Sequence, residues 1–439
     1  MTTHSENARQ WVHVGSGSFA LLLRVLTWRQ AAAMAGVALV FNLLVLPRIG
    51  GRRLYRPVDD ARGFPLGILI YPLAVLLLIL IFPSRLDIAA AAWGILAFGD
   101  GAATLVGRRV GGQRLPWNAE KTIAGTIGFV ACATAGGIAL AWWTRPDASR
   151  WFTILAPLAA AIAGGLVESI PVRLDDNISV PVAAGGVLWI ASLMTADAFR
   201  ASRPAIAAAV PWAIGLNVAA AWAGHRARTV SRSGAIGGAV VGALIYLGGG
   251  PGAWALLLVT FIFASVASRA GLRRKMRLGI AEEHGGRRGA GNAFANCGVA
   301  AMAAVAAVTT PYPAAAVLAL VVALTAGGSD TVASEVGKSW GHATFLITTF
   351  RRVKPGTPGA ISFEGTVAGL IAALVMAAIA ASLALISGRL IPVVVVAATV
   401  GALVESALGA TLEGPGILNN DMLNFINTAV AAAVALVVA

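Results

Sequence analysis

Two short stretches of this sequence place an aspartate inside an apolar run. Residues 96–108 read LAFGDGAATLVGR, and residues 325–337 read TAGGSDTVASEVG. Asp100 in the first stretch and Asp330 in the second are surrounded by small and apolar residues. Ionisable residues inside membrane spans are costly and rare, and they mark functional positions. The two stretches therefore indicate membrane helices that each carry one functional charge.

The composition of the whole chain is that of an integral membrane protein. Of its 439 residues, 58% are hydrophobic and 12% are charged, whereas a typical soluble domain has about 25% charged residues. The apolar runs are continuous rather than alternating, which excludes a membrane β-barrel. We therefore expect an all-α, polytopic membrane helix bundle.

Apolar runs of the length that a spanning helix needs, about 20 residues, recur along the chain. They begin near Ala31, Leu66, Ala89, Thr122, Phe152, Val180, Ala205, Gly234, Ala253, Ala293, Ala314, Thr366, Ile391 and Met422. This pattern predicts about 14 transmembrane helices in two related halves. The expected domains are an N-terminal segment (1–29), a first membrane domain (30–225) and a second membrane domain (230–439).

The basic residues orient the predicted spans. The chain has 33 Lys and Arg against 19 Asp and Glu, which gives a net charge of +14. Most of these basic residues fall in alternate loops, as they do on the cytoplasmic side of membrane proteins. The pattern predicts a bacterial-type inner-membrane protein whose sites face the cytoplasm. It also accounts for the net charge without nucleic-acid binding.

The two halves contain matching motifs in the same order. The first half has GDGAATLVGRRVGG (99–112), EKTIAGTIGF (120–129) and GGLVESIPVRLDDN (164–177), and the second has GSDTVASEVGKSWG (328–341), AISFEGTVAGL (360–370) and GALVESALGATLEGPGILNND (401–421). The matched polar positions are Asp100 with Asp330, Glu168 with Glu405, and residues 175–177 with 419–421. Helix packing explains repeated glycines but not repeated acids. The motifs therefore predict an internal duplication.

The matched residues suit phosphoryl transfer. Each half supplies an aspartate expected at a helix end, a glutamate on a later helix and a cluster of acidic and amide residues. Mg²⁺ usually binds through one or two carboxylates together with substrate phosphates, and nearby basic groups neutralise the transferred phosphate. A glycine-rich turn and a helix N-terminus also bind phosphate. The residues expected to contact phosphates are Gly99, Gly101, Arg108, Thr122, Arg351 and Arg352.

Longer motifs resemble known membrane enzymes. FGDGAATLVGRRVGGQRLPWNAEKTIAGTIGF and VESIPVRLDDNISVP in the first half resemble the superfamily of phytol kinase, dolichol kinase and CDP-diglyceride synthase. GIAEEHGGRRGAGNAFANCGVAA, SDTVASEVGK, ITTFRRVKPGTPGAISFEGTVAG and LEGPGILNNDMLNFINT in the second half resemble the family that includes plant phytyl-phosphate kinase. The chain thus looks like a fusion of a phytol kinase-like half and a phytyl-phosphate kinase-like half.

This resemblance implies a bifunctional membrane isoprenoid kinase. The first half would phosphorylate a prenyl alcohol of the phytol or geranylgeraniol type, and the second would convert the monophosphate to the diphosphate. The implied phosphoryl donor is a nucleoside triphosphate, CTP or else ATP, used with Mg²⁺. Lipid, nucleotide and membrane are the implied partners.

The resemblance also assigns roles to individual residues. The implied catalytic residues are Asp100, Lys121, Glu168, Asp330, Lys354 and Glu405. The implied metal ligands are Asp100, Asp176, Asn177, Asp330, Glu335, Asn420 and Asp421. The residues implied to support nucleotide or phosphate binding in the second half are Arg287, Arg288 and Asn292.

Two other functions stay open at this stage. A lipid-linked cytidylyltransferase is one, although HGG at 284–286 is followed by Arg287 and Arg288 rather than by the Asp-Arg pair of that group. A membrane transporter with inverted or parallel repeats is the other, although transporter carboxylates lie near the midplane of the membrane and these are expected near the inner ends of spans. The length of the lipid chain and the oligomeric state do not follow from the sequence.

Overall fold

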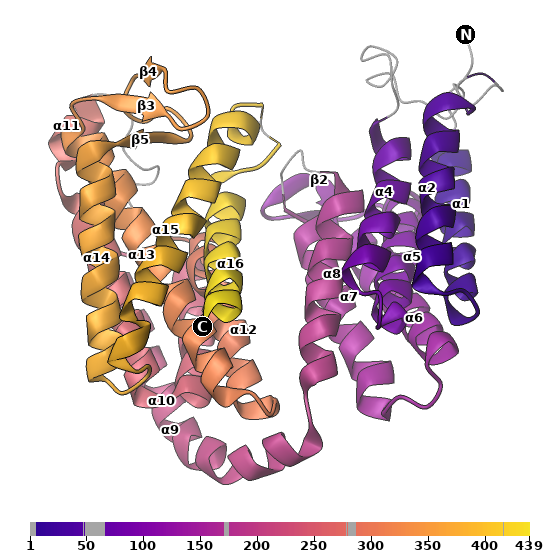
Figure 1. Cartoon of the computed structure of the whole chain (residues 1–439), viewed down its shortest axis with the longest axis horizontal. Coiled ribbons are helices and arrows are strands. Elements are labelled where there is room, and N and C mark those ends of the chain that lie inside the picture. Colours follow the sequence, from indigo (N-terminus) through magenta and orange to yellow (C-terminus); the bar gives the residue numbers. More distant parts are fainter. Residues whose placement is uncertain are drawn as a thin grey trace. The chain divides into compact units, whose positions relative to one another are not determined.

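The chain forms two compact units, Met1–Leu193 and Met194–Ala439, and each consists almost wholly of helices (Figure 1). The computed structural model describes residues 6–46, 48, 66–170, 175–277, 279, 287–415 and 417–439, with only the backbone described for 6–10, 66 and 67. The expected all-α membrane fold is confirmed by this architecture and by its apolar helices.

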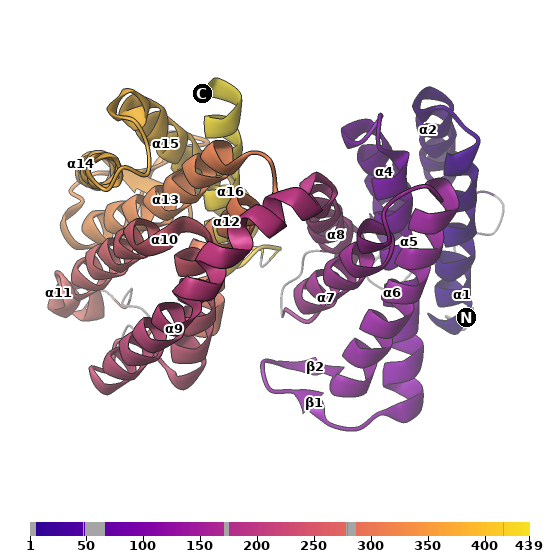
Figure 2. The same ribbon diagram turned by 90° about the horizontal axis from the view of Figure 1, so that it is seen from below.

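Unit 1 is a helix bundle with one β-hairpin. Its elements are α1 (Glu6–Ser16), η1 (Gly17–Arg24), α2 (Trp28–Leu44), α4 (Leu66–Ile81), α5 (Leu86–Val110), β1 (Arg114–Leu115), β2 (Asn118–Thr122), α6 (Ile123–Thr144), η3 (Trp151–Leu155), α7 (Ala156–Glu168) and α8 (Asp176–Leu193). Helix α5 is central and packs on α6, α7 and α8. Strands β1 and β2 pair antiparallel between α5 and α6 (Figure 2). The predicted N-terminal segment joins this bundle, because α1 and η1 pack on α5.

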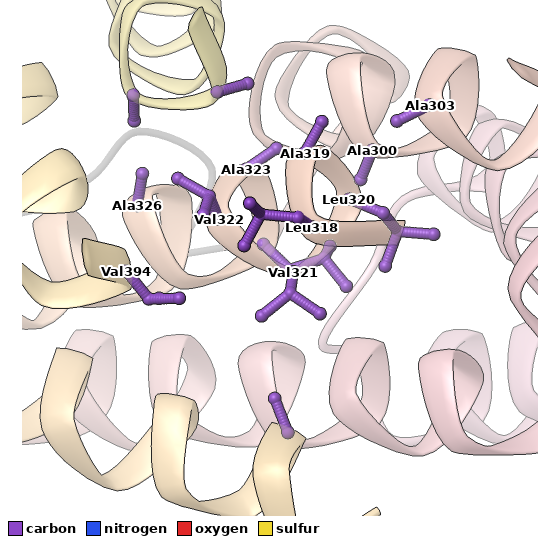
Figure 3. Close-up of a cluster of buried hydrophobic side chains, with 14 of the residues drawn as sticks. Ala300, Ala303, Leu318, Ala319, Leu320, Val321, Val322, Ala323, Ala326 and Val394 are labelled. Atoms are coloured by element: carbon purple, nitrogen blue, oxygen red, sulfur yellow. The ribbon is translucent and has the colours of Figure 1, made fainter. Parts of the chain in front are cut away.

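Unit 2 is a larger bundle with a small three-stranded sheet. Its elements are α9 (Ala196–Arg226), α10 (Arg232–Arg269), α11 (Leu272–Arg277), α12 (Ala290–Thr309), α13 (Pro313–Trp340), β3 (Thr344–Leu346), β4 (Arg352–Val353), β5 (Ala360–Ser362), α14 (Phe363–Ser382), η5 (Gly388–Leu390), α15 (Ile391–Leu408), η6 (Gly409–Glu413) and α16 (Asn420–Val438). Helix α13 is central and packs on α12, α14, α15 and α16. Its buried residues Leu320 and Val321 lie in a cluster with Ala300 of α12 and Val394 of α15 (Figure 3).

The described residues contain 11 helices that are long and apolar enough to cross a membrane, and two shorter apolar helices, Trp28–Leu44 and Ile68–Ile81. The predicted span starts fall within these helices or at most two residues before them, as Thr122 does as the cap of α6 and Leu66 does before Ile68. The chain is therefore a multi-pass membrane protein, but the count of fourteen spans is not confirmed.

Helix α10 accounts for two of the predicted spans. Its sequence contains GGGPG at 248–252, and Gly250 has a φ of 75°, which breaks the helix. Arg288 donates from its backbone N–H to Thr229 O (3.1 Å), next to the start of α10, and from its guanidinium to Ser268 Oγ (3.2 Å), at the end of α10. The two ends of a straight helix of this length would lie more than about 50 Å apart. The element is therefore a helical hairpin that turns at Gly250.

The boundary between the units differs from the predicted one. We expected it between residues 225 and 230, but the structure divides the chain at Leu193 and Met194. Helix α9 packs on α10 and α12, and Thr195 N donates to Thr309 O (2.8 Å). Helix α9 is apolar over most of its length, so its sequence gives no sign of which neighbours it packs against.

The two units repeat one order of elements. In each, the helix with the aspartate is followed by a small sheet, a helix that begins at a hydroxyl cap, a helix with the glutamate and a final helix. Thr122 Oγ1 accepts from Gly125 N at the start of α6, and Ser362 Oγ accepts from Gly365 N at the start of α14, both at 3.1 Å. The sequence match between the halves therefore has a counterpart in local structure.

Candidate functional site

The GDG motif lies inside a helix, which corrects one expectation from the sequence. Asp100 is part of α5, well before the last residue of that helix, Val110. A Cβ on Gly99 would lie 2.8 Å from the ring of Phe129, and a Cβ on Gly101 would clash with Val14. These glycines allow α5 to pack closely on α6 and α1. The prediction that they form a phosphate-binding turn was wrong, because the helix continues through them.

A lysine and two carboxylates meet in unit 1. The Lys121 ammonium, on β2, donates to Glu168 Oε1 and lies 3.4 Å from Asp176 Oδ2. Glu168 is the last residue of α7 and is 3% exposed, and Asp176 is the first residue of α8. Lys121 thus joins three elements that are far apart in the sequence. Unpaired burial of Glu168 would be costly, so this ion pair stabilises the fold.

The environment of Lys121 keeps its ammonium charged. Burial by itself lowers the pKa of Lys121, but the carboxylates of Asp176 and Glu168 outweigh burial and raise the pKa above its ordinary value. Asp100 acts in the same direction, so its carboxylate is close to the cluster. The structure therefore brings together four predicted residues of the first site.

Unit 1 also contains residues that the sequence did not point to. His13 Nε2, on α1, lies 3.7 Å from Asp100 Oδ2. The His13 ring stands edge-on to Tyr71 with ring centres 4.4 Å apart, and the Tyr71 hydroxyl accepts from Trp93 Nε1 (2.7 Å). His13 and Tyr71 precede every motif in the chain, and a lone histidine in a polar N-terminal stretch gives no signal of its position.

The remaining predicted residues of unit 1 have different surroundings. Asn177 donates from its backbone and side-chain nitrogens to Asp175 Oδ1 (2.9 and 2.7 Å), and its buried side-chain oxygen has no hydrogen-bond partner in the described part of the chain. That oxygen remains available as a ligand. Thr122 caps α6 through its hydroxyl, as threonine commonly does. Arg108 is exposed on α5.

Unit 2 has a cavity of about 240 Å³ between α13, α14, α15 and the ends of α12 and α16. Figure 1 shows these helices grouped around α13, with β3, β4 and β5 at the end of the group. The charged and amide residues that line the cavity are Arg288, Asn292, Asp330, Glu335, Lys338, Glu405, Glu413, Asn420 and Asn424. Carboxylates, amide oxygens and cations thus face one space, which is the arrangement that a metal–phosphate ligand requires.

The structure brings some predicted residues of the second half into this cavity and leaves others outside. The predicted residues in the lining are Arg288, Asn292, Asp330, Glu335, Glu405 and Asn420. Those outside it are Arg287, Arg351, Arg352 and Lys354, all exposed, and Asp421, which lies against Gly291. Lys338 on α13 supplies the cation that we expected from Lys354. The segment after Lys354 does line the cavity, at residues 356–362, but these four cations are not among the lining residues.

Glu335 is surrounded differently from a metal ligand. One of its oxygens accepts from the Lys275 ammonium and the other from Lys338 Nζ (3.1 Å). Glu335 is 3% exposed and Lys275 is 1% exposed. Each of its oxygens contacts a lysine, so its role as a metal ligand stays a prediction. Lys275 belongs to the basic run LRRKMR, which resembles an ordinary positively charged loop, so its burial could not be predicted from the sequence.

The donor atoms fit a metal that is shared with phosphate. In the parts of the chain that the structure describes, no three His, Cys, Asp or Glu side chains gather closely enough to hold a metal by themselves. Mg²⁺ commonly uses only one or two carboxylates and takes its other ligands from phosphate and water. Asp330 and Glu405 in unit 2, and Asp176 with the Asn177 oxygen in unit 1, are suitable donors of this kind.

Comparisons with known proteins place the chain among membrane proteins. The family described as "Integral membrane protein DUF92" matches residues 215–432, which lie within unit 2. No solved structure matches the chain.

Three relatives illustrate the similarity. The "Uncharacterized membrane protein sll0875" of Synechocystis sp. is 40% identical over 200 residues, which are 45% of this chain and 78% of that protein. "Protein VTE6, chloroplastic" of Arabidopsis thaliana is 33% identical over 214 residues, 47% of this chain and 64% of that protein. "Probable phytol kinase 3, chloroplastic" of Glycine max is 31% identical over 189 residues, 40% of this chain and 59% of that protein. The chain belongs to the DUF92 family of integral membrane proteins.

Proposed function

We propose that this protein is a bifunctional membrane isoprenoid kinase. Unit 1 phosphorylates a prenyl alcohol of the phytol or geranylgeraniol type, and unit 2 phosphorylates the resulting monophosphate to the diphosphate. The donor is a nucleoside triphosphate, with CTP as the first candidate and ATP as the second, and Mg²⁺ accompanies it. Both sites face the cytoplasm, in keeping with the basic residues of the loops on that side.

The observation that carries this proposal is the repeated site. Each unit places an aspartate on its central helix, a glutamate on a later helix and an amide or acid at the start of the last helix. Each also adds a lysine, Lys121 in unit 1 and Lys338 in unit 2. Carboxylates that hold a cation and a lysine that contacts phosphate are the groups that position and stabilise phosphoryl transfer. Two such sets in one chain support two related reactions.

The number of cations differs between the two sets, although unit 2 also has one more carboxylate, and this difference supports the proposed order of the steps. Around Lys121 stand three carboxylates, Asp100, Glu168 and Asp176. The cavity of unit 2 adds Arg288 to Lys338. A site with a second cation is better suited to an acceptor that already carries a phosphate, because its negative charge needs a partner. A neutral alcohol needs no such partner.

The relatives support the reaction class. One is named a probable phytol kinase, which matches the prenyl alcohol proposed as the substrate of unit 1. The chain spans 64% and 59% of the two plant relatives, so their names support a kinase without deciding both steps. A divalent cation held by Asp330 and Glu405 would neutralise the phosphate oxygens of the donor, while Lys338 and Arg288 bind and orient the phosphates.

The test uses purified full-length protein in detergent, with γ-labelled CTP or ATP, MgCl₂ and geranylgeraniol. The products are separated as monophosphate and diphosphate, and the released nucleotide is identified. We expect wild-type protein to form both products and to release the nucleoside diphosphate. Asp100→Asn is expected to block both products, and Asp330→Asn to let the monophosphate accumulate. Asp197→Asn changes an exposed aspartate on α9 and serves as the matched control.

Two results would contradict the proposal. Release of pyrophosphate instead of a nucleoside diphosphate would indicate a cytidylyltransferase. Equal loss of both products in Asp100→Asn and Asp330→Asn, including when monophosphate is supplied, would indicate one site that both units share.

A further inference from the structure

Lys275 is buried although its neighbours on α11 are exposed. The helix has the sequence LRRKMR (272–277), and Lys275 is its one buried residue. Gly271 has a φ of 66°, which turns the chain from α10 into α11. Ser339 Oγ donates to Ala270 O (3.1 Å) beside this turn. Helix α11 is therefore seated against the end of α13, close to the cavity of unit 2.

The contacts of Lys275 lead directly to a residue of the cavity. Its ammonium donates to Glu335 and to Ser268 O (2.7 Å). The other oxygen of Glu335 accepts from Lys338 Nζ (3.1 Å), and Lys338 lies in the cavity lining with 29% of its side chain exposed. Glu335 thus stands between a buried lysine and a lysine that lines the cavity.

The charges in this chain of contacts do not cancel. One carboxylate is shared by two ammonium groups, so the three residues together keep one positive charge. Without Lys275, Glu335 would have Lys338 as its only cation, and the pair would be neutral. Lys338 shares the cavity with three other carboxylates, Asp330, Glu405 and Glu413. The positive charge that Lys338 presents there therefore depends in part on Lys275, which does not line the cavity.

We propose that Lys275 is a positioning residue of the unit 2 site, which balances Glu335 so that Lys338 keeps its charge for an anionic phosphate ligand. The inference rests on the proposed function only in naming the ligand as a phosphate. It assigns a role to a basic residue that sequence patterns would attribute to membrane topology. Unit 1 has Leu105 at the place of Glu335, so the arrangement is specific to unit 2.

The test compares three variants of the full-length protein in detergent. Lys275→Met removes the balancing charge, and Lys275→Met/Glu335→Gln removes that charge together with the carboxylate that it balances. Arg274→Met changes an exposed cation on the same short helix and is the matched control. Two quantities are measured, the Kd of inorganic pyrophosphate from thermal shifts and the KM and kcat for geranylgeranyl monophosphate.

We expect Lys275→Met to weaken pyrophosphate binding and raise the KM by about tenfold, the size expected for one lost charge-assisted hydrogen bond. The kcat should change less than the KM. The double variant should recover most of the lost affinity, because Lys338 is then no longer neutralised by Glu335. Arg274→Met should behave as wild type.

A purely structural role for Lys275 predicts a different pattern. Lys275→Met would then lower the Tm but leave the Kd and KM unchanged, which would overturn the inference. Failure of the double variant to recover affinity, or a wild-type protein that does not bind pyrophosphate, would also overturn it. If the expected pyrophosphate pattern appears but geranylgeranyl monophosphate is not phosphorylated, the proposed function fails while the role of Lys275 stands.

Discussion

Unit 1 and unit 2 each carry an aspartate on the corresponding central helix, α5 in unit 1 and α13 in unit 2. The lysine of each site, however, lies on a different element in the two units. In unit 1 the cation is Lys121, on the strand that precedes α6. In unit 2 the corresponding position is Ile361, and the cation is Lys338 on the helix of the aspartate itself. The acids of the two units therefore occupy matched positions in the sequence, whereas the lysines do not. A residue's role cannot be transferred between the units by its place in a motif alone.

The units also differ below their sites. On α16, Asn424, Asn427 and Thr428 are buried, whereas the residues that line the buried side of α8 include Val180 and Ala184. Buried polar residues thus extend to the ninth residue of α16, whereas those of α8, Asn177 and Ser179, lie within its first four residues. Unit 2 accommodates more polar groups, in line with the larger number of charges at its site.

The largest expected effect of a single change is at Lys121. Lys121→Met removes the cation between Glu168 and Asp176 and should lower monophosphate formation by about 100-fold or more, the loss typical for a group that stabilises developing charge. Conversion of supplied monophosphate to diphosphate should be unaffected, because it belongs to unit 2. Arg114→Met, an exposed cation on β1, is the control. Equal loss of both reactions would contradict separate sites.

A second prediction concerns the glycines that start α6 and α14. A Cβ at Gly365 would lie 2.6 Å from Ala333 O, and one at Gly125 would lie 3.0 Å from Ala103 O. Alanine at either position should destabilise its unit by about 1–3 kcal/mol through overpacking, and Gly365→Ala should cost more. Gly186→Ala, which would meet nothing within 4 Å, is the control in thermal unfolding. Unfolding curves for all three variants that coincide with the wild type would contradict this packing.

The pH dependence of unit 1 gives a third prediction. The pKa of Lys121 is raised in the folded protein, so its stabilising contribution is complete below the unfolded pKa of about 10.4. It should be lost only as the pH rises through the higher folded pKa. The difference in Tm between wild type and Lys121→Met should therefore not shrink as the pH rises from 7 to about pH 9. A difference that shrinks across neutral pH would show that Lys121 is not paired as described.

The smallest expected effect is at Asn427. Its side chain is 0% exposed, and neither of its polar atoms has a hydrogen-bond partner within the described ranges. Replacing a buried, unsatisfied amide by an apolar group of similar size is neutral or stabilising, so Asn427→Leu should keep or slightly raise the Tm. Asn217→Leu is the control, because Asn217 is also buried but bonds to Ala213 O and Trp254. A lower Tm in Asn427→Leu alone would indicate a ligand or water at Asn427.

The sequence predicts the helices and the matched acids of this protein well, because continuous apolar runs and charges within them are strong local signals. Asp330, Glu405 and Asn420 meet in one cavity, and Lys121 meets Glu168 and Asp176. The sequence also predicts the turn at Gly250, because GGGPG separates two apolar runs. It does not reveal that α9 packs on α10 and α12. That packing depends on which apolar faces meet, and apolar residues in a membrane protein point to lipid and to protein alike.

The cations were the hardest part of the sites to predict. Lys275 and Lys354 both lie in basic stretches, and nothing in the sequence distinguishes the buried one from the exposed one. Lys275 is buried because Glu335 lies opposite it in space, 60 residues away in the chain. Such pairings arise from tertiary contacts, so they become visible only in the folded structure.

We propose that the two units contain separate sites for consecutive steps. The decisive experiment supplies geranylgeranyl monophosphate, γ-labelled CTP and MgCl₂ to purified Asp100→Asn protein and measures the rate of diphosphate formation. We expect a rate equal to that of the wild type, together with no product from geranylgeraniol. No diphosphate from the supplied monophosphate, in protein whose Tm matches the wild type, would contradict it.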